Sequence, residues 1–161
     1  MPEALLDTGE NDALPIYGNP GHLARRLHQI AVSIFLNETQ DFGITPVQFA
    51  SLTVIKAFPG VDQRSLARMI AFDRSTIGDV VIRLEKKGLL ERREGKDRRI
   101  KSLFITEAGD TMLAELGEPV RRFQRTLLEP LSEGEQLIFR YLLHKLVNQN
   151  NELSRVPLEL L

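Results

Sequence analysis

Two short clusters of cationic and small polar side chains lie in the middle of the sequence. Their members are Arg74, Ser75 and Thr76, followed by Lys96, Arg98, Arg99 and Lys101. Guanidinium and ammonium groups form charge-assisted hydrogen bonds with phosphate oxygens. Short hydroxyl side chains at the start of a helix, together with the free backbone N–H groups there, also suit an anion. These residue types and spacings indicate binding of a polyanion.

The distribution of charge along the chain agrees with this interpretation. The whole chain has a net charge of −1, but residues 62–106 hold 12 Lys and Arg against 7 Asp and Glu, a local net charge of +5. A basic block between acidic arms is typical of a nucleic-acid-binding surface. The alternative is a solvated charged face without a ligand, and charge alone does not distinguish the two.

The composition limits the class of protein. A length of 161 residues, 42% of them apolar, is typical of one globular domain. With no Cys and three His, we expect no disulfide, no thiol chemistry and no metal site. The sequence has no catalytic triad, paired carboxylates or phosphate loop, so we do not expect an enzyme. Without a long apolar run or a basic leader, we expect a cytoplasmic protein with no membrane partner.

The first cluster falls inside a predicted helix-turn-helix. Asp62 and Asp73 are each placed to cap a short helix, and only Ala71 and Phe72 separate the two helices. The second helix closes at residues 86–88, where two Lys precede a Gly. So tight a turn predicts a helix-turn-helix, although a plain helical hairpin would look similar.

The second cluster falls on a predicted β-hairpin. Residues 89–93 and 100–105 are strand-length runs on either side of the polar tip 94–99, and such a charged hairpin next to a helix-turn-helix forms a wing. Capping signals and apolar periodicity predict the other helices. They run from Pro20 to Glu38, from Pro46 to the Pro59-Gly60 break, from Thr106 to Pro130 with a bend at Pro119, and from Ser132 through Val147.

Three motifs in this order resemble the MarR family of transcriptional regulators. They are ITPVQFASL (44–52), DRSTIGDVVIRLEKKGLLER (73–92) and DRRIKSLFIT (97–106), and the resemblance extends over roughly residues 20–150. It implies a mainly α fold with a small β-wing, a winged helix-turn-helix lobe and a helical dimerisation region. It further implies an obligate homodimer whose two lobes bind a pseudo-palindrome in double-stranded DNA.

The expected organisation follows from the resemblance and the composition. We expect a flexible acidic arm over residues 1–18, a single MarR-like domain over 19–150 and a tail over 151–161. Within the domain, residues 62–106 form the winged helix-turn-helix, and residues 19–44 and 107–150 supply the dimerisation helices.

Each expected DNA contact has a physical reason. Polar side chains at the start of the second helix suit base edges, Gly78 permits close approach, and Arg83 suits a phosphate. On the leading helix, the side chains expected to clamp the phosphate backbone are Gln63, Ser65 and Arg68. The alternative for Ser75 and Thr76 is that they only cap the helix.

The expected wing contacts involve the cations of the second cluster. Lys96, Arg98 and Lys101 suit the narrow, electronegative minor groove of A·T-rich DNA. By resemblance, Arg99 is the minor-groove residue and Asp97 is its brace. A carboxylate among four cations could also hold the hairpin in shape.

A small organic effector is the expected regulatory signal, because the sequence lacks the Cys of a thiol sensor. By resemblance the pocket lies between the dimer core and the DNA lobe. The residues offered to it are Arg25, Arg26, His28, Phe35 and Phe49. Cations beside aromatic rings suit an aromatic carboxylate or an aromatic acyl-CoA. The alternative is that these residues form interface salt bridges and core.

We therefore expect a ligand-responsive repressor that an aromatic acid, or its CoA thioester, releases from a pseudo-palindromic operator. The alternative is a winged-helix module that binds protein or RNA and has no small-molecule effector.

Overall fold

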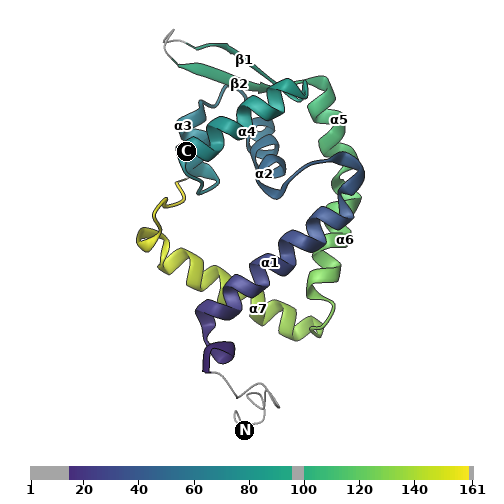
Figure 1. The fold of residues 1–161 in the computed structure, drawn as a ribbon, viewed down its shortest axis with the longest axis vertical. Helices are drawn as coiled ribbons and strands as arrows, with labels where there is room; N and C mark the ends of the chain where they lie inside the picture. The colour runs from purple at the N-terminus through teal and green to yellow at the C-terminus, as the bar shows by residue number, and fades with distance from the viewer. Residues whose placement is uncertain (1–14, 96–99, 160–161) are drawn as a thin grey trace.

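Seven α-helices and one two-stranded sheet form the part of the chain that the computed structural model describes, residues 15–95 and 100–159 (Figure 1). In chain order they are α1 (Pro20–Glu38), α2 (Pro46–Ala57), α3 (Gln63–Met69), α4 (Arg74–Lys86), β1 (Leu90–Glu94), β2 (Lys101–Ile105), α5 (Glu107–Glu115), α6 (Gly117–Leu128) and α7 (Glu133–Gln149). Short 3₁₀ turns are η2 (Pro15–Gly18), η3 (Gln40–Phe42) and η4 (Asn151–Leu153). The predicted fold class, mainly α with a small β-wing, is confirmed.

Local capping determines where most of these helices begin. The Thr45 hydroxyl accepts from the Gln48 N–H at the start of α2, and the Gln48 side chain accepts from the Thr45 N–H. Ser132 and Glu135 form the same capping box at α7. Such side chains satisfy backbone donors that have no partner within the helix, so the sequence signals and the observed starts agree.

The predicted long helix after the wing is divided in two. α5 ends at Glu115 and α6 begins at Gly117, so the predicted bend at Pro119 is wrong by a few residues. Pro119 instead lies in the first turn of α6, where a missing backbone N–H has no cost. Leu116, at the break, is fully buried.

The winged helix-turn-helix lobe has a core of buried apolar side chains between its helices and its sheet. α2, α3 and α4 contribute Leu52, Ile55, Leu66, Ile77, Val81 and Leu84, and the strands contribute Leu90 and Leu103, all at most 2% exposed. The strands pair antiparallel from Leu90 with Ile105 to Glu94 with Lys101. Backbone hydrogen bonds from Gly60 N–H to the Leu103 carbonyl and from Leu103 N–H to the Val61 carbonyl anchor the wing root to the α2–α3 connection.

A second packed region joins the lobe to the long helices. α1 packs along α6, and the rings of Phe35, Phe49 and Phe123 form an aromatic cluster with centroid distances of 5.9 and 5.6 Å. These rings come from α1, α2 and α6, so the cluster ties the lobe to the helical region.

Helix α7 leaves its apolar side chains uncovered in the protomer. They are Leu137, Ile138, Tyr141, Leu142, Leu146 and Val147, each 48–68% exposed. A monomeric protein seldom exposes so continuous an apolar surface, so another chain is expected to cover it. Among the described residues, no helix is long and apolar enough to cross a membrane.

The junction between the wing and α5 supplies a test of the fold. A Cβ on Gly109 would lie 2.1 Å from the Leu89 carbonyl oxygen. Gly109→Ala should therefore lower the free energy of unfolding by about 3 kcal/mol through overpacking, measured by urea denaturation. Gly134→Ala in α7 is the matched control, because a Cβ there meets nothing within 4 Å. It should leave stability unchanged or raise it by up to about 1 kcal/mol; equal destabilisation of both variants would contradict the packing argument.

Candidate nucleic-acid interface

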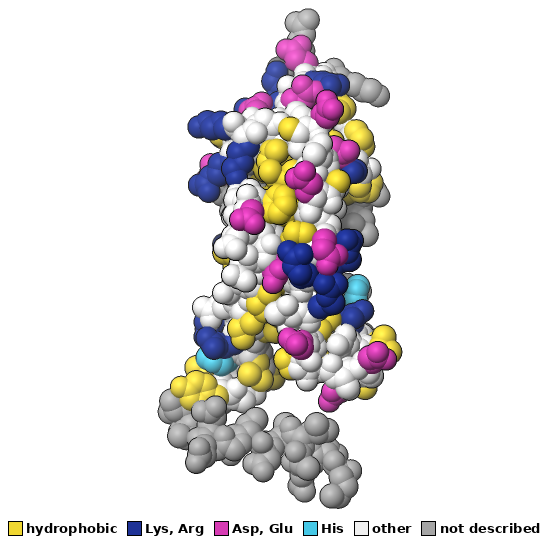
Figure 2. Space-filling model, turned by 90° about the vertical axis from the view of Figure 1, so that its right-hand side faces the viewer, with side chains coloured by type: hydrophobic (Ala, Val, Ile, Leu, Met, Phe, Trp, Pro, Cys, Tyr) yellow, Lys and Arg dark blue, Asp and Glu magenta, His cyan; other side chains and the backbone are white. Residues whose placement is uncertain are grey.

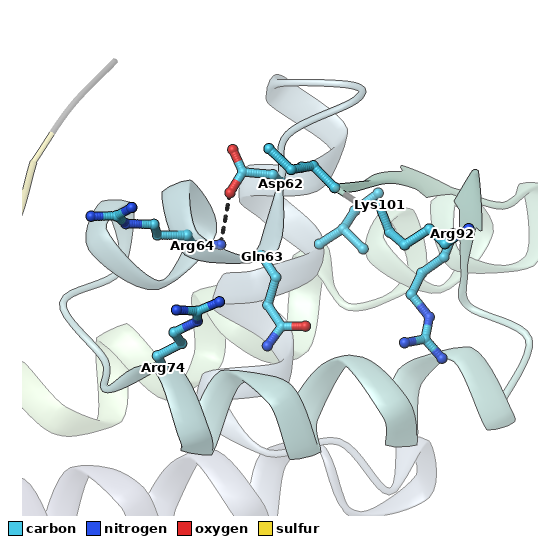
Figure 3. A pocket seen from close by; sticks show the side chains of 8 residues that line it. Asp62, Gln63, Arg64, Arg74, Arg92 and Lys101 are labelled. Carbon is cyan, nitrogen blue, oxygen red and sulfur yellow. Dashed lines mark hydrogen bonds between the residues drawn. The ribbon is translucent and has the colours of Figure 1, made fainter. Parts of the chain in front are cut away.

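A cationic hollow of about 320 Å³ lies between the start of α3, the start of α4 and the strands of the wing (Figure 3). Its lining residues are Asp62, Gln63, Arg64, Arg74, Arg92, Ile100, Lys101 and Leu103. Four of them are cations contributed by four different elements. Only Asp62 among the eight is acidic, and its carboxylate already accepts hydrogen bonds within the fold.

Asp62 caps α3 with both carboxylate oxygens. One oxygen accepts from the N–H groups of Arg64 (2.8 Å) and Ser65 (3.0 Å), and the other accepts from the Ser65 hydroxyl (2.7 Å). Partial burial acts to raise the pKa of Asp62, but these hydrogen bonds outweigh it and lower the pKa below its ordinary value. Because its hydroxyl donates to Asp62, Ser65 belongs to this cap, and its predicted role as a phosphate clamp remains a prediction.

Asp73 caps α4 in the same way. Its carboxylate accepts from the Ser75 hydroxyl (2.6 Å), the Thr76 N–H (2.9 Å) and the Thr76 hydroxyl (2.7 Å). The hydrogen bond from Ser75, followed by those from Thr76, holds the pKa of Asp73 well below its ordinary value. The capping alternative for Ser75 and Thr76 thus has direct geometric support. Any contact that they make with bases requires their free lone pairs or a rotation of the hydroxyl.

The structure shows that Gly78 has a packing role within the lobe. A Cβ at Gly78 would lie 3.1 Å from the Gln63 amide nitrogen, and Figure 3 shows the Gln63 side chain pointing from α3 towards α4. Gly78 therefore leaves room for Gln63. Gln63 lines the hollow, and its predicted role as a backbone clamp stays a prediction.

Of the other cations predicted to contact DNA, some are exposed, some are paired with a carboxylate, and the rest lie outside the described residues. Arg74 and Arg83 are exposed on α4, and Lys101 is exposed at the end of β2 nearest the wing loop, 3.7 Å from a Glu94 carboxylate oxygen. Arg68 on α3 forms an ion pair with Glu159. The predicted wing-tip residues Lys96, Asp97, Arg98 and Arg99 lie outside the described residues and stay predictions.

Two cations that line the hollow were not predicted from the sequence. Arg64 is the second residue after the Asp62 cap and is exposed, and Arg92 lies on β1 with its guanidinium bonded to the Glu85 carboxylate of α4. That hydrogen bond raises the pKa of Arg92 and lowers the pKa of Glu85. The sequence carried a signal for Arg64, because it lies in the polar first turn after the Asp62 cap and before the apolar residues of α3. Arg92 had no such signal.

A second group of arginines is neutralised by its neighbours. On α6, Arg121 and Arg125 each pair with Glu118, and Arg122 pairs with Glu38 of α1, at 2.8–2.9 Å. Figure 2 shows this side of the molecule with positive and negative side chains intermixed. Such paired charges make a poor polyanion site, in contrast to the hollow at α3 and α4.

The five predicted effector residues do not form one pocket in the protomer. Arg25 and Arg26 line a surface hollow of about 660 Å³ along α1, together with Tyr17, His22, Leu23 and Ile30. His28 is exposed but is not among these lining residues. Phe35 is only 3% exposed and packs with the half-buried Phe49 in the aromatic cluster, roughly 14 Å further along α1 at 1.5 Å per residue. Within one protomer the five residues therefore do not line one hollow, and their shared role in an effector site of the dimer stays a prediction.

Comparisons with known proteins agree with this geometry. A model of the MarR family matches residues 42–100. The PcaV transcriptional regulator from Streptomyces coelicolor, solved in complex with its natural ligand, is 35% identical with a TM-score of 0.76, over 84% of this chain and 96% of PcaV.

Two further solved structures are similar over most of the chain. BpsR from Bordetella bronchiseptica is 25% identical with a TM-score of 0.76, over 81% of this chain and 95% of BpsR. The DNA binding of BpsR is regulated by 6-hydroxynicotinic acid. The transcriptional repressor CouR, bound to a 23-mer DNA duplex, is 25% identical with a TM-score of 0.77, over 82% of this chain and 94% of CouR.

The Asp73 cap makes stability depend on pH in a defined direction. Its pKa is lowered on folding from an ordinary value of 3.8, so its contribution is complete above that pH and is lost as the pH falls below it. Asp73→Asn should lower the melting temperature at pH 7, and its deficit relative to the parent should shrink below about pH 4. Thermal melts from pH 7 to 2.5 test this. Asp79→Asn, which removes the same charge from α4 outside the cap, controls for net charge; a deficit that persists unchanged at pH 2.5 would refute the assignment.

Proposed function

The chain belongs to the MarR family of transcriptional regulators, and from this premise we propose that it is a dimeric repressor released from its DNA operator by a small aromatic acid. The observation that carries the proposal is the hollow beside α4 that is lined by the four cations Arg64, Arg74, Arg92 and Lys101. Cations around an exposed helix N-terminus are the arrangement that binds phosphates while the helix enters the major groove.

The DNA-binding unit of the proposal is residues 62–106. α4 is 13 residues long, its inner face is buried, and Arg74 and Arg83 are exposed on it. Arg64 and Lys101 flank it, as expected for groups that hold the duplex backbone on both sides of the inserted helix. The bound 23-mer duplex of CouR supports the same use of this lobe. Lys96, Arg98 and Arg99 would reach the minor groove, with Asp97 as their brace.

The dimer rests on the uncovered apolar side chains of the helical region. Leu23 and Ile30 of α1 are 52% and 45% exposed, and α7 adds six more apolar side chains. We assign dimerisation to residues 19–44 and 107–150 within a single domain over residues 19–150. A two-fold dimer places two lobes on successive half-sites, which explains a pseudo-palindromic operator. As a DNA-binding regulator, the protein would act in the cytoplasm.

The effector site of the proposal is the hollow along α1. Arg25 and Arg26 can pair with a carboxylate, and Tyr17 and His22, stacked edge to face at 5.7 Å, offer apolar ring surface to an aromatic group. Regulation of BpsR by 6-hydroxynicotinic acid supports an aromatic acid here. An aromatic acyl-CoA is the larger alternative, and the open shape of the hollow admits it.

Mutation of the hollow tests DNA binding. The probe is a duplex selected by the parent protein from a random-sequence pool. If a dimer neutralises about eight phosphates, the log–log salt dependence of its affinity should have a slope of about −7. Arg64→Ala and Arg74→Ala should each weaken binding about tenfold and make the slope shallower by roughly 2, because a dimer holds two copies.

Arg121→Ala is the control, since it removes an exposed arginine that lies on α6 and pairs with Glu118. It should bind the duplex like the parent. A flat salt response, or a stronger affinity for protein or single-stranded RNA than for duplex DNA, would favour the interaction-module alternative instead.

Thermal shift measurements test the effector. 6-Hydroxynicotinic acid is the first probe, and an aromatic ligand at 100 times its dissociation constant should stabilise the dimer by about 2.7 kcal/mol. The shift should fall below detection in the Arg25→Ala/Arg26→Ala double variant and remain in Arg121→Ala. Stabilisation of the double variant equal to that of the parent would place the ligand elsewhere; no response to any aromatic acid or acyl-CoA would remove the effector from the proposal.

A further inference from the structure

The C-terminal segment returns from the helical region to the DNA-binding lobe. After α7 ends at Gln149, residues 150–159, here called the C-terminal strap, turn through η4 and run back to α3 (Figure 1). Neither the capping signals nor the family motifs pointed to this path.

The strap is held in a defined shape by its own hydrogen bonds. Leu158 N–H donates to the Asn151 side-chain oxygen (2.8 Å), and the Asn151 amide donates back to the Leu158 carbonyl (3.2 Å). The Ser154 hydroxyl donates to the Val156 carbonyl (3.0 Å). Val156 and Pro157 are half-buried. A loop closed in this way loses less conformational entropy when its end docks than a free tail would.

The end of the strap contacts α3 through both backbone and side chain. Glu159 N–H donates to the Arg68 carbonyl (3.1 Å), and Arg68 Nη1 donates to a Glu159 carboxylate oxygen (2.8 Å). Nearby, Arg155 Nη2 lies 3.9 Å from the Asp73 carboxylate that caps α4. The strap therefore touches the last turn of α3 and the first turn of α4, on either side of the helix-turn-helix turn.

From these contacts we infer that the strap is an intramolecular competitor of DNA, in which the Glu159 carboxylate occupies the position that a phosphate would take on Arg68. The inference rests on the proposed function, because it assigns Arg68 to the phosphate backbone. A carboxylate and a phosphate compete for the same guanidinium donors, and Glu159 occupies one of the five N–H donors of Arg68 and offsets its positive charge. A phosphate therefore binds Arg68 more strongly once Glu159 is displaced.

The size of the effect follows from the exposure of the pair. Arg68 and Glu159 side chains are 44% and 54% exposed, and exposed ion pairs contribute little in water. Removing the carboxylate should therefore strengthen DNA binding by only about two- to fivefold per lobe. Such an element would set the threshold of operator binding and would not block it.

Glu159→Gln tests the inference, with Glu152→Gln as the matched control. Both remove one negative charge from the strap, but Glu152 hydrogen-bonds only to its neighbour Asn151 among the described residues. Affinity is measured for the duplex selected by the parent protein. Because a dimer carries two straps, Glu159→Gln should bind about 4- to 25-fold more tightly. Glu152→Gln should bind like the parent, and Glu159→Gln should add nothing in an Arg68→Ala background.

A second measurement reports docking of the strap without DNA. Trypsin cleaves after Arg155, and a docked strap protects that bond. Cleavage there should be faster in Glu159→Gln and in Arg68→Ala than in Glu152→Gln, and the selected duplex should accelerate it in the parent by displacing the strap.

The outcomes separate this inference from the proposed function. Protection at Arg155 with no duplex binding by the parent would refute the proposed function and the inhibitory role with it, while leaving the docking intact. Duplex binding with unchanged affinity in Glu159→Gln would refute competition alone. Weaker binding by Glu159→Gln would overturn it as well, since the strap would then assist DNA binding.

Discussion

Burial of the inner face of α4 is the interaction on which the rest of the lobe depends. Ile77, Val80, Val81 and Leu84 are at most 6% exposed, and each contributes about 1.5–3 kcal/mol when removed from water. Because these four side chains recur at three- and four-residue spacing, their burial turns the opposite face of the helix outward. The exposure of Arg83 follows from that packing, whereas Arg74, three residues before Ile77, is exposed because it lies in the first turn of the helix. The cationic surface therefore depends on burial of the apolar face of α4.

Three carboxylates next to the cationic hollow stabilise the lobe by capping helices or by pairing with an arginine. Asp62, Asp73 and Glu85 all lie next to cations of the hollow, yet each is committed to a partner within the lobe. The two aspartates satisfy backbone donors at helix starts, and Glu85 orients Arg92 against α4. These carboxylates keep their charge, but in the lining of the hollow four cations outnumber the single carboxylate of Asp62. This explains how a lobe with so many acidic residues can still present a cationic hollow.

The aromatic cluster of Phe35, Phe49 and Phe123 connects the two functional regions of the protomer. Phe35 lies on α1, further along the helix that carries Arg25 and Arg26, and Phe49 lies on α2, which packs beneath α3 and α4. A change in the position of α1 would reach the lobe through these rings, because close-packed side chains transmit displacement. The strap forms a second connection, from α7 to α3, on the outside of the molecule. The lobe is thus held from the inside by packing and from the outside by an exposed ion pair.

The sequence by itself determined the features that depend on neighbouring residues. Helix starts at Thr45, Asp62, Asp73 and Ser132 follow from capping, and the wing follows from two short strands around a polar tip, since both involve contacts only a few residues apart. Only the tertiary structure decided which side chains share a site. It brought Arg64 and Arg92 into one hollow, separated Arg25 from Phe35, placed the helix break at Leu116 and laid Glu159 on Arg68. These outcomes depend on how elements distant in the chain pack together, and the spacing of residues along a single element carries no record of that.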